Sequence, residues 1–331
     1  MAQLIIFDME WNMGYQPKTF LYQGVEQVLR GEIIQIGAVK MEGQEMKDTF
    51  SITLKPNVFR KLHHHVAKVT GLTQEDINRG VPLKTGLEKF REWCGPDAVL
   101  GEWGLDDVPV LKQNLVLAGL DEGWPCCWYD LQRMFTAQIP RGEGEGMMLE
   151  AVVDRLGIEK EEAFHDALSD AVYTAKVCQF IDMEKGMREY PTGEAQLKEL
   201  LCPPDKQRLD FVSWPGYVDG EAWRTEPAIR AARCPACGAP LVLDEDDIWL
   251  RRGNNCMYSM ARCTEHGPMM IWLRRSRSDG LHFLFARAVE KADKALKERW
   301  QKEKKSALQR ARRKREKEAA EAMLRVKNAG K

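Results

Sequence analysis

Strand patterns alternate with helix patterns over the first 185 residues, and this alternation limits the fold more than any other feature of the chain. Three successive strand patterns in the first half can form a meander. Strands and helices alternate in the second half, which predicts a partly parallel sheet covered by helices, and so an α/β fold. The expected strands are residues 4–7, 33–41, 48–54, 98–102 and 125–130. The expected helices lie near residues 74–77, with Thr73 as N-cap, and at residues 83–93, 109–118, 148–156 and 167–181.

Two acidic residues, Asp8 and Glu10, directly follow the first apolar run. Strand alternation places both carboxylates on one face and Met9 on the other. We expect these acids at the edge of a core, where neighbouring carboxylates resist joint ionisation. A divalent cation would remove that conflict, whereas a strand that simply ends in two solvated acids is the structural alternative.

A third acid, Asp107, lies two residues before Pro109 in a Trp103-Gly104-x-x-Asp107 pattern. Pro109 fits the first turn of a helix, so Asp107 can serve as its N-cap. Taken alone, this capping role explains the residue.

A histidine and an acid, His165 and Asp170, stand five residues apart near the last helix pattern. Five helical residues turn the chain by about 500°, so the two side chains cannot share one face of a continuous helix. They converge only if His165 lies in the preceding loop and Asp170 in the first turn, with Asp166 as the cap between them. The structural alternative is a loop histidine and an acid favoured by the helix dipole.

In this order, the three patterns resemble the exonuclease motifs of the DnaQ-like DEDDh superfamily, and most closely its RNase T-like branch with the enhanced-RNAi type of RNA exonuclease. Residues 32–39 resemble the family's second strand, and residues 70–73 resemble its Thr-Gly-Ile-Thr element. Gln35 departs from the glutamate of many members, but not at a metal position. The resemblance covers roughly residues 3–182.

The resemblance implies an RNase H-like fold with a mixed five-stranded sheet and flanking helices. It also implies four carboxylates that bind two Mg²⁺ or Mn²⁺ ions roughly 4 Å apart, and a histidine general base. The carboxylates are Asp8, Glu10, Asp107 and Asp170, and the base is His165. Asp106 neighbours Asp107, but the spacing from Trp103 favours Asp107. The implied activity is a 3′→5′ exonuclease that acts on 3′ ends of RNA or single-stranded DNA.

Four further residues are candidates for nucleic-acid contact. In this superfamily the elements matched by Thr70, Gly71 and the residues after Asp8 lie near the terminal nucleotide. Trp11 and Trp103 are able to stack on a base there, or merely to line the edge of the sheet. We interpret the run of histidines at residues 63–65 as surface residues.

The chain has nine cysteines, and four of them cluster between residues 231 and 286. Cys234 and Cys237 have the spacing and following glycine of a zinc knuckle, and Cys263 with His266 repeats that shape. The region is therefore expected to be a zinc-ribbon-like module with one structural Zn²⁺ held by these four residues. Cys256 in place of His266 is the alternative ligand, and reduced core cysteines are the alternative to zinc. The module also offers Arg274 and Arg275 as phosphate contacts.

A net charge of −1 hides an asymmetry between the body and the end of the chain. Residues 287–331 contain 17 Lys/Arg and 7 Asp/Glu, which leaves a net charge of −11 on residues 1–286. We interpret residues 287–331 as a basic, solvated helix or tail, with either a polyanionic partner or none.

These features divide the chain into an exonuclease domain (1–185), a connecting segment rich in proline and aromatic residues (186–230), the zinc-ribbon-like module (231–286) and the basic tail (287–331). Without a secretory or membrane-spanning pattern, the expected location is cytoplasmic, with no membrane partner. Nucleic acid is the expected partner, and protein partners stay undetermined. The alternative function is a catalytically weak or inactive nucleic-acid-binding scaffold that acts through the module and the tail.

Overall fold

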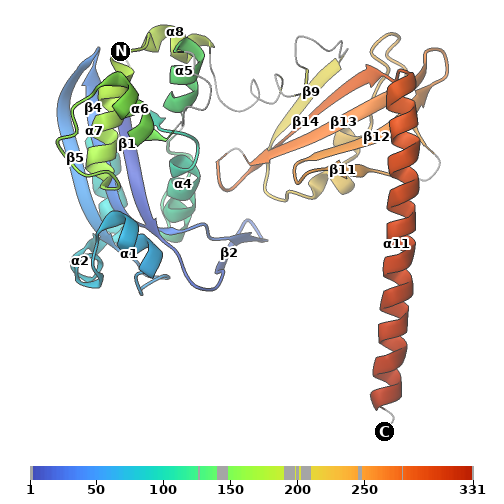
Figure 1. The fold of residues 1–331 in the computed structure, drawn as a ribbon, viewed down its shortest axis with the longest axis horizontal. Coiled ribbons are helices and arrows are strands. Elements are labelled where there is room, and N and C mark those ends of the chain that lie inside the picture. The colour runs from blue at the N-terminus through green and yellow to red at the C-terminus, as the bar shows by residue number, and fades with distance from the viewer. Residues whose placement is uncertain are drawn as a thin grey trace. The chain divides into compact units, whose positions relative to one another are not determined.

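The computed structural model describes residues 3–125, 127–139, 148–189, 198, 201–202, 210–244, 248–277 and 279–329. Cys126 and parts of the predicted connecting segment lie outside these residues. The chain forms two compact units (Figure 1). Unit 1 contains residues Met1–Ala195 and Arg277–His282, and unit 2 contains residues Gln196–Ser276 and Phe283–Lys331. The helices in the described part of the chain include none with the length and apolar character of a membrane span.

Unit 1 is built on a mixed sheet with the strand order β6-β5-β4-β1-β7-β8. The first three long strands form the expected antiparallel meander, and β7 and β8 pair in parallel beside β1. The sheet has six strands rather than the expected five, because two residues after the second helix pair with β5. The strands are β1 (Gln3–Asn12), β4 (Glu32–Glu42), β5 (Glu45–Lys55), β6 (Val81–Pro82), β7 (Ala98–Glu102) and β8 (Trp128–Asp130). A hairpin of β2 (Thr19–Tyr22) and β3 (Val25–Val28) was not predicted.

Helices cover both faces of this sheet. Phe7 of β1 packs with Phe90 and Leu111 on one face, whereas Ile6 packs with Ala171 on the other. The helices are α1 (His64–Thr70), α2 (Gln74–Arg79), α3 (Leu83–Cys94), α4 (Asp107–Leu117), α5 (Leu131–Gln138), α6 (Leu149–Leu156), α7 (Ala167–Cys178) and α8 (Met183–Glu189). The predicted helices are confirmed to within a few residues at their ends, and Thr73 caps α2 as expected.

Unit 2 is built on an antiparallel sheet with the order β10-β12-β13-β14-β9, and β11 also pairs with β12. The long strand β12, which is buried along most of its length, was not predicted as a strand. The elements of this unit are β9 (Asp210–Tyr217), η1 (Ala222–Arg224), α10 (Pro227–Arg230), β10 (Val242–Leu243), β11 (Leu250–Arg252), β12 (Cys256–Cys263), β13 (Gly267–Arg277), β14 (Phe283–Lys291) and α11 (Lys294–Ala329).

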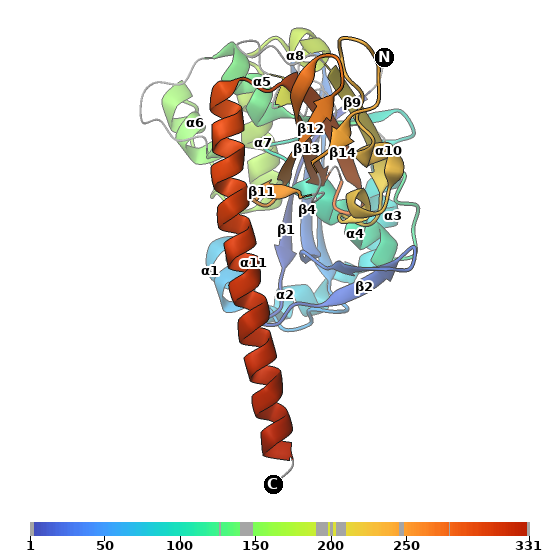
Figure 2. The ribbon, with the colours of Figure 1, turned by 90° about the vertical axis from the view of Figure 1, so that its right-hand side faces the viewer.

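Two layers cover the sheet of unit 2. On one face, Tyr258 and Trp272 pack with Trp300 of α11, which is 1% exposed. On the other face, Phe285 packs with Trp223 from the segment between β9 and β10. Figure 2 shows α11 as one unbroken helix.

The predicted boundaries of the connecting segment and the tail are therefore wrong. The connecting segment was expected to run from residue 186 to residue 230, but β9, η1 and α10 belong to the sheet and core of unit 2. The tail was expected to start at residue 287, but Arg287 lies in β14, is 5% exposed and donates to the carbonyl oxygens of Ile229 and Ala231. Trp300 anchors the first turns of α11 in the core, so the expectation of a fully solvated helix fails there.

Candidate active site

The carboxylates of Asp8 and Glu10 lie on the same face of β1. Met9 packs in the core on the opposite face, as strand alternation predicts. In the ladder with β4, Asp8 stands opposite Gly37 and Glu10 stands opposite Gln35. A bulge directly after Glu10 marks the end of the regular pairing. The two acids therefore lie at the end of a buried strand, as expected from the sequence.

The side chain of Asp107 is hydrogen-bonded to the backbone of β1 between these two acids. Its Oδ1 atom accepts the backbone N–H of Met9 at 2.9 Å. Asp107 is the first residue of α4 rather than its N-cap, so the expected capping role is wrong, because the cap position belongs to Asp106. Asp106 is exposed and pairs with Arg30 at 2.6 Å, whereas Asp107 is buried.

Glu102 takes over the capping role and was missed by the sequence analysis. Its Oε2 atom accepts the backbone N–H groups of Asp107 at 2.7 Å and Val108 at 3.3 Å. Glu102 is fully buried at the end of β7, and burial raises its pKa well above the usual value. The available signal was an acid after an apolar run, which is the same signal that marked Asp8. Glu102 thus fixes the backbone of Asp107 and leaves the Asp107 side chain free for β1.

His165 lies in the loop before α7, and Asp170 lies in the first turn, as their convergence requires. The backbone N–H of His165 donates to Oδ2 of Asp170 at 3.1 Å. Asp166 is the N-cap and accepts from the backbone N–H groups of Leu168 and Ser169. His165 has a φ of 67°, in the left-handed region that non-glycine residues occupy at a cost of about 1–2 kcal/mol. The chain keeps this conformation beside Asp170, where it turns the imidazole toward the acids.

Gly37 and Gln35 of β4 bring the start of α7 onto the sheet. A Cβ atom at Gly37 would lie 2.1 Å from backbone atoms of Ala167 and Leu168, so only glycine permits this approach. The side-chain amide of Gln35 donates to Asp166 at 2.7 Å and accepts from the backbone N–H of Ala167 at 3.3 Å. The residue at position 35 thus holds the cap of α7, a role that the sequence did not reveal.

Burial and mutual repulsion perturb all four carboxylates. Burial, together with the carboxylates of Asp170 and Asp107, raises the pKa of Glu10 to about 8. Burial also raises the pKa of Asp107 to about 7 and that of Asp170 to about 6. Burial and the carboxylates of Asp107, Asp170 and Glu10 raise the pKa of Asp8 well above its usual value. The four acids therefore lie close enough to oppose one another's ionisation.

This donor set fits hard divalent cations. Potential ligand atoms of Glu10, His165 and Asp170 all lie within 4.8 Å of one another. The buried Oδ1 atom of Asp170 has no hydrogen-bond partner among the described residues. Carboxylate oxygens are the preferred ligands of Mg²⁺ and Mn²⁺, and a bound cation would relieve both the repulsion and the unpaired oxygen.

The four residues predicted to contact the nucleotide make mainly structural contacts within unit 1. Trp11 is partly buried against the core next to α3 and α4, and Trp103 packs with Phe135 at 5.8 Å between ring centroids. The Thr70 hydroxyl donates to the carbonyl oxygen of Val66, and Gly71 caps α1 with a φ of 72°. These four residues are not placed against the carboxylates by any described contact.

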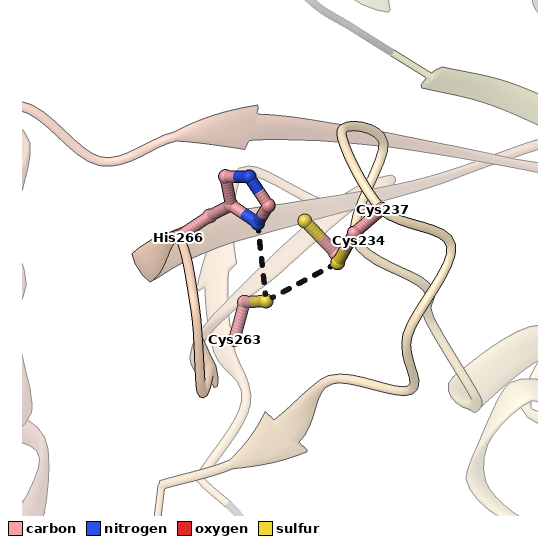
Figure 3. A group of neighbouring side chains, drawn as sticks. All are labelled: Cys234, Cys237, Cys263 and His266. Carbon is pink, nitrogen blue, oxygen red and sulfur yellow. Dashed lines mark hydrogen bonds between the residues drawn. The ribbon is translucent and has the colours of Figure 1, made fainter.

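In unit 2, the structure brings together the four predicted zinc ligands. Atoms of Cys234, Cys237, Cys263 and His266 that can bind a metal all lie within 4.8 Å of one another (Figure 3). The Sγ atom of Cys263 lies 3.6 Å from Sγ of Cys237 and 3.7 Å from Nδ1 of His266. Cys256, the alternative ligand, packs instead in the core cluster of Trp300. Three thiols and an imidazole at these separations fit a tetrahedral zinc site.

The two arginines predicted to contact phosphate differ in the contacts described for their side chains. The guanidinium of Arg275 donates to Glu221 and to the carbonyl oxygens of Gly220 and Asn254, and its side chain is 18% exposed. Arg274 lies partly buried on the same strand. Arg275 is therefore mainly occupied by contacts within unit 2.

One protein family and several known proteins are similar to part of this chain. A family model described as exonuclease, RNase T, matches residues 6–178. The chain is 27% identical over 210 residues to the probable 3′-5′ exonuclease KapD of Bacillus subtilis (strain 168), a match covering 60% of this chain and 96% of the relative. It is 27% identical over 178 residues to the PolC-type DNA polymerase III of Clostridium perfringens (strain 13 / Type A), covering 54% of this chain but only 11% of the polymerase. A solved nuclease domain of 3′hExo, a DEDDh family member bound to rAMP, aligns with a TM-score of 0.47 at 20% identity, covering 58% of this chain and 96% of that one.

Proposed function

We propose, from the premise that the chain belongs to the RNase T family of exonucleases, that it removes nucleotides one at a time from the 3′ ends of RNA or single-stranded DNA. The observation that carries this proposal is the convergence of Asp8, Glu10, Asp107 and Asp170, whose pKa values are raised by burial and by one another. Such a cluster is costly unless it binds cations, and phosphodiester hydrolysis needs cations at this kind of site.

In this proposal the four carboxylates hold two Mg²⁺ or Mn²⁺ ions. When bound, such ions supply an activated water and neutralise charge on the leaving 3′ oxygen. Asp107 contributes its second oxygen, because Oδ1 is bonded to Met9. Asp170 contributes Oδ1, which is buried without a partner among the described residues.

His165 is the proposed general base. Its side chain is exposed, so a water molecule at the acids is able to reach it. Its ring lies within 4.8 Å of ligand atoms of Glu10 and Asp170, where the attacking water would lose its proton. The hydrogen bond from its backbone to Asp170 fixes the loop that carries the ring.

The terminal nucleotide is proposed to contact Trp11, Thr70, Gly71 and Trp103. The support for these contacts is the resemblance of the surrounding elements to the exonuclease superfamily. Exposed parts of the two indoles would stack on a base, and the backbone at the end of α1 would contact the sugar or phosphate.

Unit 2 is proposed to be a zinc-stabilised module that binds nucleic acid and is not catalytic. Four protein ligands leave no open position for a water or substrate, so Zn²⁺ held by Cys234, Cys237, Cys263 and His266 would stabilise the fold. Arg274, Arg275 and the basic end of α11 are its proposed phosphate contacts. The exonuclease domain is proposed to span residues 1–185, and the location is proposed to be cytoplasmic.

Purified protein incubated with 3′-labelled and 5′-labelled RNA and DNA tests the proposal. We expect stepwise loss from the 3′ end in Mg²⁺ or Mn²⁺ and no cleavage with chelator. A comparison of RNA with DNA of the same sequence gives the sugar preference. Absence of cleavage on every substrate, with retained binding, would instead identify a nucleic-acid-binding scaffold.

A further inference from the structure

Two buried acids at the ends of neighbouring strands of unit 1 are not among the proposed metal ligands. Glu102 ends β7 and Asp130 ends β8, and the two residues stand opposite each other in the parallel ladder of these strands. Glu102 is 0% exposed and Asp130 is 9% exposed. Burial raises the pKa of both carboxyl groups. Because burying an acid costs free energy, two of them at adjacent strand ends require an explanation.

The first of these acids holds the backbone at the start of α4. The Oε2 atom of Glu102 accepts the N–H groups of Asp107 at 2.7 Å and of Val108 at 3.3 Å. The other oxygen, Oε1, is buried and has no hydrogen-bond partner among the described residues. A half-exposed Asp, Asn or Ser would cap the helix without this cost, so the stability of α4 alone does not account for Glu102.

The second acid holds the loop that leads to α4. Asp130 is the N-cap of α5, where its Oδ1 atom accepts the backbone N–H of Arg133 at 2.9 Å. Further hydrogen bonds to Asp130, among them one from the backbone N–H of Gly104, oppose the rise of its pKa. Gly104 lies in the loop between β7 and α4 and has a φ of 112°. The two acids thus hold the backbone at both ends of residues 104–107.

These contacts bear on the cation site through Asp107. In the ladder of β1 with β7, pairing runs up to Ile6 opposite Gly101. Further along β1, the side chain of Asp107 provides the acceptor for the backbone N–H of Met9 at 2.9 Å. The position of Asp107 against β1 therefore depends on where residues 104–107 place the start of α4.

We propose that Glu102 and Asp130 are positioning residues, which fix Asp107 against β1 and thereby set the affinity of the four carboxylates for divalent cations. Both act through the backbone between β7 and α4, and neither touches cation or substrate. Replacing partners that orient metal ligands typically changes metal affinity by roughly 10–100-fold. The inference rests on the proposed function for the assignment of Asp107 as a ligand, and it adds the two residues that control how this ligand is presented.

The first experiment measures Mn²⁺ binding to the full-length protein without substrate. Mn²⁺ prefers oxygen ligands to thiols, and electron paramagnetic resonance measures the free ion during a titration. Glu102→Ala removes the acceptor for the two N–H groups, whereas Glu102→Gln keeps an acceptor oxygen in a side chain of the same shape. We expect Glu102→Ala to bind Mn²⁺ about tenfold more weakly, and Glu102→Gln to bind it nearly as the wild type does. Equal losses in both variants would overturn the positioning role, since the charge would then matter rather than the acceptor.

Asp130 is tested against an aspartate that makes the same local contact elsewhere in unit 1. Asp182 accepts the backbone N–H of Lys185 at 2.9 Å, as Asp130 accepts that of Arg133. Alanine at either position loses an acceptor at the start of a helix, but only Asp130→Ala also releases Gly104. We expect Mn²⁺ binding to weaken severalfold in Asp130→Ala and to stay unchanged in Asp182→Ala. Unchanged binding in Asp130→Ala would show that this residue does not act on the cation site.

Two glycine variants keep the test decisive if a buried acid cannot be removed without unfolding. Gly104 and Gly157 both have a positive φ, and a Cβ atom at either would meet no atom of a non-neighbouring residue within 4 Å. Alanine therefore strains the backbone at both positions without a clash. We expect both variants to lose thermal stability, but only Gly104→Ala to weaken Mn²⁺ binding. A stability loss in Gly104→Ala with unchanged Mn²⁺ affinity would refute the proposal.

Amide hydrogen exchange separates failure of this inference from failure of the proposed function. The N–H of Met9 reports the position of Asp107 whether or not a cation binds. We expect it to exchange about tenfold faster in Glu102→Ala and Gly104→Ala, relative to the other amides of β1. A wild type that binds no Mn²⁺ would contradict the proposed function, whereas a selective change at Met9 would still support the positioning of Asp107. Wild-type exchange at Met9 in both variants would contradict the positioning role itself.

Discussion

The backbone N–H of Met9 donates to Oδ1 of Asp107 at 2.9 Å, so the third acid of the site is bonded to the peptide between the first two. This single contact sets the spacing of three carboxylates from two elements that are distant in sequence. It also separates two roles of Asp107, since one oxygen positions the residue and the other is the proposed metal ligand.

Replacing Asp107 in two ways distinguishes these roles. Asp107→Asn keeps an acceptor for Met9 but loses the charge, whereas Asp107→Ala loses both. We expect turnover to fall by about 100-fold or more in either variant, because changes even in groups that support metal ligands cost 10–100-fold. Only the alanine variant should also lose about 1–3 kcal/mol of stability, since it leaves the N–H of Met9 buried and unpaired.

Denaturant unfolding and 3′-end trimming assays on both variants check this prediction. Asp106→Asn is the matched control, because Asp106 is exposed and pairs with Arg30. Near-normal turnover in Asp107→Asn would remove this residue from the site.

The positive φ of His165 makes stability and activity respond in opposite directions to one substitution. His165→Ala and His165→Gly both lose the imidazole, so both should lose most turnover while they retain metal binding. Glycine relieves about 1–2 kcal/mol of left-handed strain and costs about 0.5–1 kcal/mol through the unfolded chain. His165→Gly should therefore be more stable than His165→Ala.

Thermal unfolding and single-turnover hydrolysis measure the two effects separately. A His165→Ala variant with substantial turnover would contradict the proposed base. Equal stability of the alanine and glycine variants would mean that the loop relaxes at no cost when the imidazole is absent.

The raised carboxylate pKa values predict how stability depends on pH without metal. The pKa of Glu10 is about 8 in the folded chain and about 4.3 in an unfolded one. Between these two pH values the folded state binds more protons than the unfolded state. The stability that Glu10 contributes is therefore present below about pH 4 and is lost as the pH rises through 8. Asp107 and Asp170, with pKa values of about 7 and about 6, add to this loss over lower ranges.

Bound Mg²⁺ or Mn²⁺ should cancel this loss, because the carboxylates are then ionised and compensated. The gain in melting temperature on adding metal to chelated protein should grow as the pH rises from about 6 to about 9. Glu10→Gln should flatten the pH dependence in chelator. A metal effect that is constant over this range would contradict a shared carboxylate site.

The four predicted zinc ligands give a prediction that also tests which residues bind the ion. Wild-type protein should contain one zinc per chain, Cys237→Ser should lose it, and Cys256→Ala should retain it, because Cys256 lies in the core cluster of Trp300. Because zinc binding supplies about 10 kcal/mol or more to folding in small sites of this kind, its removal should unfold unit 2.

Metal analysis measures the zinc content of each variant, and tryptophan fluorescence measures the unfolding of unit 2. Hydrolysis of a short oligonucleotide should persist in Cys237→Ser, since the four acids lie in unit 1. Loss of zinc from Cys256→Ala but not from a His266→Ala variant would restore the all-cysteine alternative.

The candidate site could be predicted from sequence because its three motifs are short and, taken in order, resemble those of the DEDDh exonucleases. Strand alternation placed Asp8 and Glu10 together, and the helix period required His165 to lie outside α7. The supporting contacts could not be predicted, because they depend on which strands become neighbours. Glu102 reaches the start of α4 across a loop, and Gln35 reaches Asp166 across 131 positions.

The errors in unit 2 have a related cause. The strand β12 contains cysteines that were considered only as ligands, and because both of its faces are buried it shows no alternation of apolar and polar residues. In α11, only the first turns pack on the sheet, so the charged composition of the whole helix hid the anchor that Trp300 forms together with Leu296 and Ala307. Short segments with one large apolar side chain give little periodic signal.

This anchor decides where the basic end of the chain can be removed. Deleting residues 287–331 would remove half of β14 as well as Trp300, and should unfold unit 2. Deleting residues 309–331 instead removes nine Lys/Arg and three Asp/Glu and leaves Trp300 and Ala307 in place. The shorter deletion should therefore preserve zinc content and the turnover of a short oligonucleotide. It should weaken binding of a long RNA and lower the salt slope by several units if the helix contacts phosphates, at about 0.7 per contact for single strands. Anisotropy titrations over a salt series check this, and an unchanged slope would show that the basic end of α11 does not bind nucleic acid.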